Sequence, residues 1–129
     1  MIVGLGVDIE EVSRIQQAIA RHGERFLRRV FTPAEIAYCN KHKNSPERFA
    51  ARFAAKEAAM KALGTGWRGG VTWRDLEVVN LPSGKPTLKL SGRAQEICRN
   101  LGGERIALSL THTAAYALAE VVVEGKDAE

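Results

Sequence analysis

Cysteine and histidine are scarce in this sequence. Its two cysteines, Cys39 and Cys98, are too far apart to form a CxxC unit, and its three histidines are equally scattered. A structural zinc site is therefore not expected. We interpret both thiols as buried, unreactive side chains, which is the common state of a free cysteine.

Long apolar runs are absent too. No segment approaches the roughly 20 apolar residues that cross a membrane. The opening residues, MIVGLGVDIEEV, lack the basic region, apolar stretch and cleavage site of an export signal. These absences predict a cytoplasmic protein with no membrane partner.

Signatures of nucleotide and base binding are sparse. Only 6% of the residues are aromatic, which leaves little surface on which bases could stack. No GxxxxGK[ST] motif occurs. The glycines at 4 and 6 lack the third glycine of a dinucleotide fingerprint, and those at 64 and 66 most simply end a helix. Neither glycine pair by itself predicts a nucleotide site.

What is present fits one domain of ordinary size. The 129 residues are 45% hydrophobic and 26% charged, as in a soluble globular protein. The formal net charge of +4 favours an anionic partner. Charge alone leaves nucleic acid, phosphate groups and an acidic protein as alternatives.

Apolar periodicity and turn signals predict one strand, then helices, then further strands. The β-branched run 2–9 predicts a buried strand with Asp8 at its exit. Capping boxes at Ser13 and Thr32 predict helices that end near Gly23 and residue 42, and a third helix runs without a breaker over 45–63. The remaining expected elements are strands at 76–80 and 87–90, a helix at 91–101 and an antiparallel hairpin at 105–125.

This order of elements lacks the regular βαβ alternation of a parallel sheet, so we expect an α+β fold. The chain contains no internal repeat, low-complexity block or linker. Residues 1–129 are therefore expected to form a single domain.

Two carboxylates stand in apolar surroundings. At about 100° per residue, Glu57 shares a helix face with Phe53 and Met60, and Asp8 ends an apolar strand. If helix and strand pack together, the carboxylates would repel unless a cation lay between them, and Mg²⁺ with substrate phosphates is a natural occupant. The alternative is an ordinary Glu57–Lys61 pair, with Asp8 capping the next turn. Spacing alone favours the alternative.

Basic residues surround the same helix. They are Lys41, Lys43, Arg48, Arg52, Lys56 and Lys61. A solvated basic face is the default interpretation, although a metal-bridged polyphosphate would need such cations, because phosphoryl transfer depends on positioning and charge neutralisation. A second row, Arg14, Arg21, Arg25 and Arg28, would lie within about 60° on one continuous helix, unless Gly23 interrupts it. This row suits an acidic protein surface at least as well as nucleic acid.

Four segments, in this order along the chain, resemble one known family. They are GLGVDIEEVSRI, RFAAKEAAMKALGTG, NLPSGKPTLKLSG and SLTHTAAYALAEVVV. The family is holo-[acyl-carrier-protein] synthase, the small bacterial type of 4′-phosphopantetheinyl transferase, and the resemblance covers nearly the whole chain. Its most specific marks are the aspartate after the first strand and the pattern F-x-x-K-E-A-x-x-K. The resemblance implies the 4′-phosphopantetheinyl transferase fold, an antiparallel sheet packed on a long central helix.

The resemblance implies an enzyme that moves phosphopantetheine from coenzyme A to a serine of apo-acyl carrier protein, releasing adenosine 3′,5′-bisphosphate, for fatty acid biosynthesis. It implies Mg²⁺ as cofactor, bound by Asp8 and Glu57 and bridging the pyrophosphate of coenzyme A. Lys61 matches a lysine that stabilises charge on the pyrophosphate, and the role of Lys56 stays open. The serine hydroxyl must lose a proton, which a carboxylate at the metal could accept directly or through a bound water, and Glu57 is our candidate.

Contacts to coenzyme A are also implied. Arg52, with Lys43 and Arg48 as weaker candidates, would meet the 3′-phosphate. His112 matches a histidine near the nucleotide. The turn Gly84, Lys85 and Pro86 would touch the cofactor as well.

The resemblance further implies a homotrimer with active sites between neighbouring subunits, to which the terminal hairpin would contribute. The arginine row that begins at Arg14 matches the region that docks the acidic carrier protein, and no nucleic-acid partner is implied. The competing hypothesis is a non-catalytic basic module that binds nucleic acid or an acidic protein, and the two differ in whether Glu57 is essential.

Overall fold

The computed structural model describes residues 1–66 and 69–127. In chain order its elements are β1 (Ile2–Glu11), α1 (Val12–His22), α2 (Glu24–Val30), α3 (Pro33–Asn40), α4 (Ser45–Leu63), a 3-10 turn (Trp73–Asp75), β2 (Leu76–Asn80), β3 (Pro86–Leu90), α5 (Gly92–Asn100), β4 (Gly103–His112) and β5 (Tyr116–Gly125). These elements confirm the α+β class.

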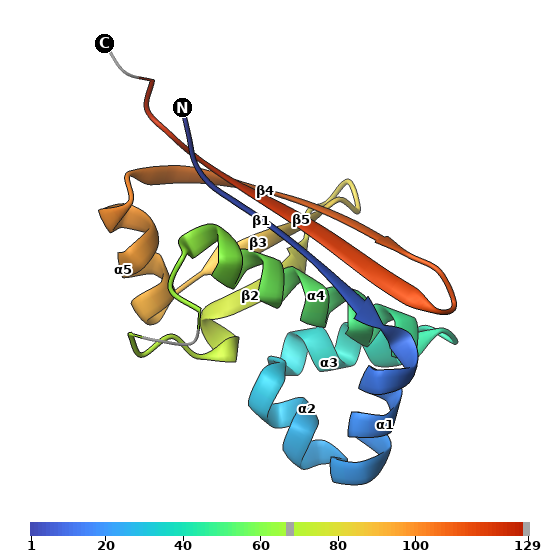
Figure 1. The fold of residues 1–129 in the computed structure, drawn as a ribbon. Coiled ribbons are helices and arrows are strands. Elements are labelled where there is room, and N and C mark those ends of the chain that lie inside the picture. Colours follow the sequence, from blue (N-terminus) through green and yellow to red (C-terminus); the bar gives the residue numbers. More distant parts are fainter. Residues whose placement is uncertain (67–68, 128–129) are drawn as a thin grey trace.

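The central unit is α4 packed on a three-stranded antiparallel sheet. The strand order is β1-β5-β4, and α4 lies across one face of the sheet (Figure 1). A proline in its first turn starts α4, and Gly64, in the left-handed conformation at φ 78°, ends it. The alanine-rich sequence of α4 lets its backbone come close to the strands, because alanine adds little bulk between them.

Two glycines of β1 make this contact possible. A Cβ atom on Gly4 would overlap the carbonyl oxygen of Ala62, and one on Gly6 would overlap that of Ala58. Both overlaps are with backbone, which cannot move aside as a side chain can. Glycine at these positions therefore sets the distance between β1 and α4.

The apolar core lies on both sides of α4. Buried alanines of α4, Met60 and Leu63 pack with Val121 and Val123 of β5, and with residues of β2, β3 and α5. A second cluster joins Phe49 of α4 to Phe31 and to residues of α1 and α3. The remaining small sheet, β2-β3, pairs in antiparallel register from Leu76 opposite Leu90 to Asn80 opposite Pro86.

A buried ion pair ties α4 to α3 and β2. Lys56 Nζ lies 2.8 Å from Glu35 Oε1, and both side chains are fully buried. The same ammonium donates to the carbonyls of Trp73 and Leu76, while Glu35 accepts from the backbone N–H groups of Thr32 and Val78. Lys56, whose role the sequence left open, therefore connects three segments of the core.

Most predicted elements are confirmed. The helix at 45–63, the strand at 76–80 and the C-terminal hairpin match the structure, and Thr32 with Glu35 forms the expected capping box. Both cysteines are buried, and burial raises the pKa of the Cys39 thiol to about 12. These elements carry strong local signals, so their prediction needed no knowledge of packing.

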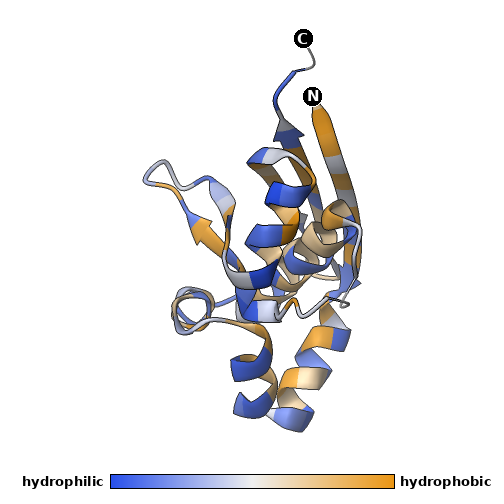
Figure 2. Cartoon of the chain, turned by 90° about the vertical axis from the view of Figure 1, so that its left-hand side faces the viewer, coloured by the Kyte–Doolittle hydropathy of each residue, from blue (hydrophilic) through white to orange (hydrophobic). Residues whose placement is uncertain are grey.

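Two predictions about the N-terminal region are wrong, and one open alternative is decided. The first helix begins at Val12 after Glu11, so no capping box forms at Ser13. The helix ends before Gly23 as expected, and Gly23, at φ 57°, separates α1 from α2, so the four arginines do not share one helix. The first strand continues to Glu11, beyond Asp8, and is not buried on both faces, since Leu5, Val7 and Ile9 are 52–62% exposed. Figure 2 shows that the residues of β1, next to the N-terminus, are mostly hydrophobic.

Candidate active site

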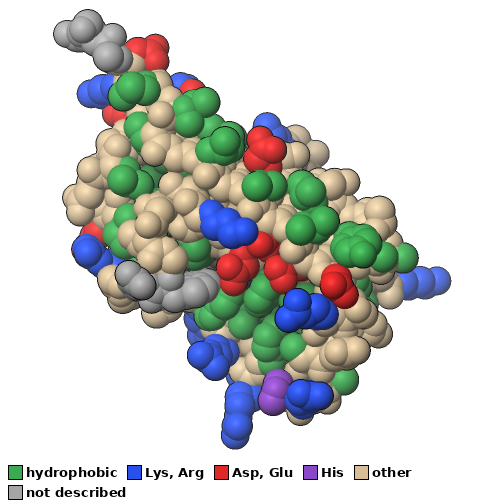
Figure 3. Space-filling view, viewed as in Figure 1, with side chains coloured by type: hydrophobic (Ala, Val, Ile, Leu, Met, Phe, Trp, Pro, Cys, Tyr) green, Lys and Arg blue, Asp and Glu red, His purple; other side chains and the backbone are tan. Residues whose placement is uncertain are grey.

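The alternation of side chains along β1 directs Asp8 toward α4. Gly4 and Gly6 face Ala62 and Ala58 of the helix, and successive even-numbered residues of a strand lie on the same face. Asp8 and Glu10 therefore follow along the edge of α4 that carries Glu57 and Lys61. Acidic side chains with neighbouring Lys and Arg side chains gather near the centre of the face in Figure 3.

Asp8 is bound by Lys61. The Lys61 Nζ atom lies 3.1 Å from Asp8 Oδ1 and 3.1 Å from the carbonyl oxygen of Val7. The Asp8 side chain is only 11% exposed and that of Lys61 is 55% exposed, so the ammonium reaches the carboxylate from the solvent side. The alternative in which Asp8 caps the next helix is not realised, because the residue at the N-cap of α1 is Glu11.

The second carboxylate oxygen of Asp8, Oδ2, is buried, and within the described ranges 1–66 and 69–127 no hydrogen-bond donor reaches it. A buried carboxylate oxygen without a donor is costly, so such an atom indicates a position that a ligand, cation or proton completes.

Glu10 is a third carboxyl group beside Asp8 and Glu57, which the sequence analysis missed. Burial raises its pKa to about 7; a side-chain hydrogen bond with Asp8 and the charges of Asp8 and Glu57 act in the same direction, against a smaller effect of Arg14. The signal was available in the sequence, since Glu10 lies two residues after Asp8 on a strand.

This donor set suits a hard divalent cation. It consists of carboxylate oxygens without histidine or cysteine, and Mg²⁺ characteristically uses one or two carboxylates and completes its shell with water and substrate phosphates. Within the part of the chain that the structure describes, no group of three or more His, Cys, Asp or Glu side chains already encloses a metal position. Any cation at Asp8 and Glu57 would have to take its remaining ligands from water or substrate.

Arg52 lies in a different environment. It is only 4% exposed, its Nη2 donates to Asn80 Oδ1 at 2.8 Å, and its guanidinium stacks 3.9 Å from the ring centre of Tyr38. Asn80 in turn donates to the carbonyl oxygen of Gly84 at 3.0 Å. Burial lowers the pKa of Arg52. The structure thus connects Arg52 with the turn at Gly84, through an asparagine that the sequence analysis did not select.

His112 and Arg48 lie near the start of α4. His112 Nδ1 lies 3.0 Å from Glu47 Oε1, and Arg48 contacts Asn44 and the hydroxyl of Tyr38. Lys43 and Lys85 are exposed. Tyr38 therefore contacts both Arg48 and Arg52 and holds the two arginines near each other.

The carboxylates Asp8, Glu10 and Glu57 with Lys61 (the acidic group) lie on one side of α4. Arg48, Arg52 and His112 (the basic group) lie on the opposite side. In the sheet, Glu10 of β1 and His112 of β4 both pair with Ala117 of the intervening β5, so two strand spacings, about 10 Å, separate them. Lys61 bonds to β1, whereas Arg52 bonds to β2. From Arg52 to Glu57 the helix turns by about 140°. One chain does not bring these two groups together.

The predicted docking arginines form two sets. Arg14 and Arg21 line one shallow hollow on α1. Arg28, on α2, pairs with Glu24 at 3.0 Å and lines a different hollow between α2 and α3. Arg25 is exposed on α2. The positive φ of Gly23, 57°, causes this division because it breaks the helix between α1 and α2.

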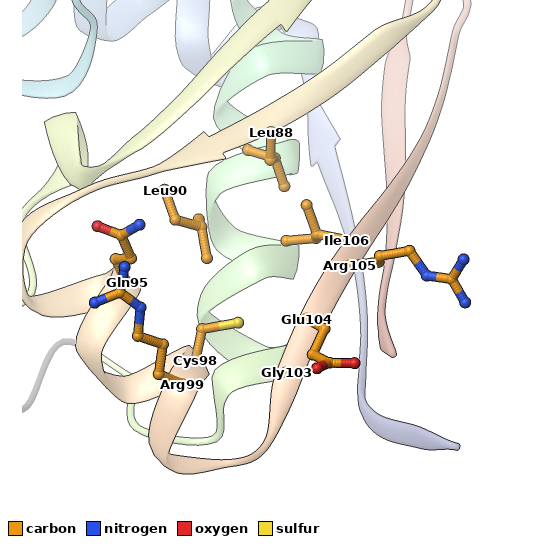
Figure 4. A pocket seen from close by; sticks show the side chains of 9 residues that line it. All are labelled: Leu88, Leu90, Gln95, Cys98, Arg99, Gly103, Glu104, Arg105 and Ile106. Carbon is orange, nitrogen blue, oxygen red and sulfur yellow. The ribbon is translucent and has the colours of Figure 1, made fainter. Parts of the chain in front are cut away.

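A cavity of about 500 Å³ lies elsewhere, between β3, α5 and β4 (Figure 4). Apolar side chains of Leu88, Leu90 and Ile106 point into it, with Arg99 and Arg105 at its edge. None of the predicted site residues lines it. We found no helix in the described ranges with the length and apolar character needed to span a membrane.

A chain in which a long α4 presents Glu57 and Lys61 to an aspartate on β1 matches a known family. Residues 4–119 match the model of the 4′-phosphopantetheinyl transferase superfamily, and the chain belongs to this superfamily. Within it, the similarity is to the holo-[acyl-carrier-protein] synthases. The protein of that name from Koribacter versatilis is 59% identical over 124 residues, which cover 96% of this chain and 99% of the relative.

Solved structures agree. The holo-[acyl-carrier-protein] synthase of Neisseria meningitidis superposes with a TM-score of 0.87 at 35% identity, covering 96% of this chain and 99% of that one. The enzyme of Helicobacter pylori in complex with coenzyme A gives a TM-score of 0.81 at 32% identity, covering 93% and 99%. The family implied by the sequence motifs is confirmed.

Proposed function

We propose that this protein transfers the 4′-phosphopantetheine group of coenzyme A to a serine of apo-acyl carrier protein, for fatty acid biosynthesis in the cytoplasm. The products are holo-acyl carrier protein and adenosine 3′,5′-bisphosphate. The observation that carries the proposal is the meeting of Asp8, Glu57 and Lys61 where β1 crosses α4. Family membership supports the same reaction.

Asp8 and Glu57 would hold Mg²⁺, with the Glu10 carboxyl beside them. The buried Asp8 Oδ2, which lacks a donor among the described residues, supports this assignment, as does the all-oxygen donor set. When bound, the ion supplies positive charge to the pyrophosphate oxygens of coenzyme A.

In the reaction, the serine hydroxyl oxygen forms a bond to the β-phosphorus, and the bond from that phosphorus to the bridging oxygen breaks. Adenosine 3′,5′-bisphosphate leaves with the electron pair. Glu57 accepts the serine proton, directly or through a bound water. Lys61 carries a half-exposed ammonium at the same place and stabilises the negative charge that develops on the leaving pyrophosphate oxygen.

The basic group would bind the nucleotide end of coenzyme A. Arg52 meets the 3′-phosphate, Lys43 and Arg48 are weaker candidates, and His112 lies near the nucleotide. The turn Gly84, Lys85 and Pro86 contacts the cofactor as well. The link from Arg52 through Asn80 to Gly84 supports a shared role, because it holds one predicted phosphate ligand against the predicted turn.

We assign the two groups to one active site built by neighbouring subunits of a homotrimer. The acidic and basic groups of a single chain lie on opposite sides of α4, so a neighbour is needed to bring them to the same coenzyme A. The outer face of the sheet supports association, because Leu5, Val7 and Ile9 of β1 are more than half exposed. Their neighbours in register on β5 are Val122, Glu120 and Leu118. Such an apolar face is the kind that a second copy covers.

The carrier protein would dock on the arginines of α1 and α2. Arg14 is the nearest of them to the acidic site, since its charge acts on Glu10. Arg21, Arg25 and Arg28 extend the basic surface away from that point. An acidic carrier protein bound along these arginines would present its serine near Glu57, because Arg14 lies beside the carboxylates.

Mass spectrometry of the carrier protein tests the function. The protein is incubated with coenzyme A, Mg²⁺ and apo-acyl carrier protein, and the carrier is weighed. We expect the mass to increase by one phosphopantetheine with the wild-type chain and with Glu96→Gln, an exposed glutamate of α5. Glu57→Gln should fold and lose nearly all transfer. No mass gain with the wild-type chain would reject the function, and full transfer by Glu57→Gln would reject the assignment of Glu57.

A further inference from the structure

We propose that Lys61 is a tethered counter-ion of Asp8 that makes metal binding and coenzyme A binding depend on each other. In the ligand-free chain the ammonium occupies the Asp8 carboxylate. When coenzyme A and the divalent cation bind, the ammonium moves from Asp8 to the pyrophosphate. The inference rests on the proposed metal site and adds a coupling between its two ligands.

The contacts of Lys61 support an ammonium that can move. Nζ bonds to Asp8 Oδ1 and to the Val7 carbonyl, each at 3.1 Å, and more than half of the Lys61 side chain is exposed. Lys56, one turn earlier on the same helix, is fully buried and makes three shorter or equal contacts. The two lysines therefore differ in freedom: Lys56 is fixed in the core, whereas Lys61 is anchored by one carboxylate and one carbonyl.

The Lys61 ammonium and a divalent cation repel each other when both bind the Asp8 carboxylate. A lysine ammonium on Oδ1 places one positive charge within a few ångströms of any divalent cation that reaches Oδ2, and charges at about 4 Å repel appreciably even in water. Metal binding without coenzyme A is therefore weakened by Lys61. Once the pyrophosphate is present, the ammonium has a new anionic partner, and the repulsion is relieved.

The coupling is reciprocal. If Lys61 lowers the affinity for metal only while the pyrophosphate is absent, coenzyme A raises the affinity for metal, and metal raises the affinity for coenzyme A by the same factor. The expected consequence is a site that loads both ligands together and binds free metal poorly. The chain then keeps Asp8 neutralised between catalytic cycles without retaining a metal ion.

The test measures Mn²⁺ binding rather than catalysis. Free Mn²⁺ is followed by electron paramagnetic resonance in titrations of the full chain, with and without coenzyme A and in the absence of carrier protein. The variants are Lys61→Met and Lys61→Gln, which remove the ammonium, and Lys89→Met, which removes the same charge from an exposed position of β3. Thermal unfolding of each variant confirms that it is folded.

We expect Lys61→Met and Lys61→Gln to bind Mn²⁺ about tenfold more tightly than the wild-type chain without coenzyme A, as for the loss of one nearby like charge. The enhancement by coenzyme A should shrink by a similar factor, and Lys89→Met should match the wild type. Mn²⁺ binding by the wild type with unchanged or weaker affinity in both Lys61 variants would overturn the coupling alone. No Mn²⁺ binding by the wild-type chain under either condition would overturn the metal site and the coupling together.

Discussion

Replacing Lys56 with methionine tests how the core holds the active-site helix. The buried Lys56 ammonium bonds to Glu35 and to the carbonyls of Leu76 and Trp73, at 2.8, 2.8 and 3.1 Å. Methionine fills a similar volume but donates no hydrogen bond. The variant therefore leaves a buried Glu35 carboxylate that keeps, among the donors of the described residues, the N–H groups of Thr32 and Val78.

The expected loss of stability is large. Removing one partner of a buried ion pair typically costs about 3–5 kcal/mol, because the remaining charge stays desolvated and uncompensated. The carbonyls of Leu76 and Trp73 each lose one donor, and that of Trp73 keeps the backbone N–H of Leu76, so their contribution to this cost is smaller. We expect about 4 kcal/mol, which is a large part of the roughly 5–15 kcal/mol that keeps a typical domain folded.

Urea unfolding followed by far-ultraviolet circular dichroism measures this loss, with all variants at one protein concentration because association would shift the midpoint. The second variant combines Lys56→Met with Glu35→Gln. The amide oxygen still accepts a hydrogen bond, but no buried charge remains, so about half of the loss should return. Lys89→Met, at an exposed position, should change stability by less than about 0.5 kcal/mol.

A loss of less than about 1 kcal/mol for Lys56→Met, or no recovery of stability when Glu35→Gln is added, would refute this role of the ion pair. Either result would mean that the carboxylate finds water or another donor, and that α4 does not depend on the ion pair. A destabilised but folded Lys56→Met protein should also lose transfer activity, since Glu57 is the next residue and moves with the helix.

Two further predictions concern β1. Gly6→Ala should destabilise the chain by about 1–3 kcal/mol and weaken Mn²⁺ binding, because the new Cβ overlaps the Ala58 carbonyl and pushes Asp8 away from Glu57; wild-type stability in urea would contradict this. Glu10→Gln should alter the pH dependence of stability. Because burial raises the Glu10 pKa from 4.5 to about 7, the folded wild type keeps a proton that the unfolded chain releases, so its stability relative to the variant falls as pH rises through this range. Thermal unfolding of both proteins across this pH range, with a metal chelator present, measures the difference. Parallel pH profiles of the wild type and Glu10→Gln would contradict the raised pKa of Glu10.

The local elements of the fold were predictable because their signals are short-range. A capping box at Thr32, a breaker-free run from Ser45 and a glycine at 64 define α3 and α4 without any tertiary information. Predictions failed where packing decides between alternatives. The apolar run of β1 is the same whether both faces are buried or one stays exposed, and the outcome depends on α4, which packs on the face of Gly4 and Gly6 and leaves Leu5, Val7 and Ile9 exposed.

Part of the candidate site was predictable as well. The pattern around Phe53 to Lys61 and the aspartate after the first strand selected Asp8, Glu57 and Lys61, and the structure brings Lys61 to Asp8. Glu10 was missed although its i+2 position after Asp8 on a strand places both on one face, whereas Asn80 carries no special spacing until its neighbours are known. Lys56 looked equivalent to Lys61 in sequence, but 100° per residue over five residues turns it toward Glu35 in the core.

The sequence by itself determined the α+β class, the family and the residue types of the site, since these follow from periodicity, caps and motif order. Only the tertiary structure decided that the acidic and basic groups lie on opposite sides of α4. The physical reason is that the side each residue faces depends on the register of the strands and on the rotation of α4 against them. Both are fixed only when Gly4 and Gly6 let β1 pack against the helix.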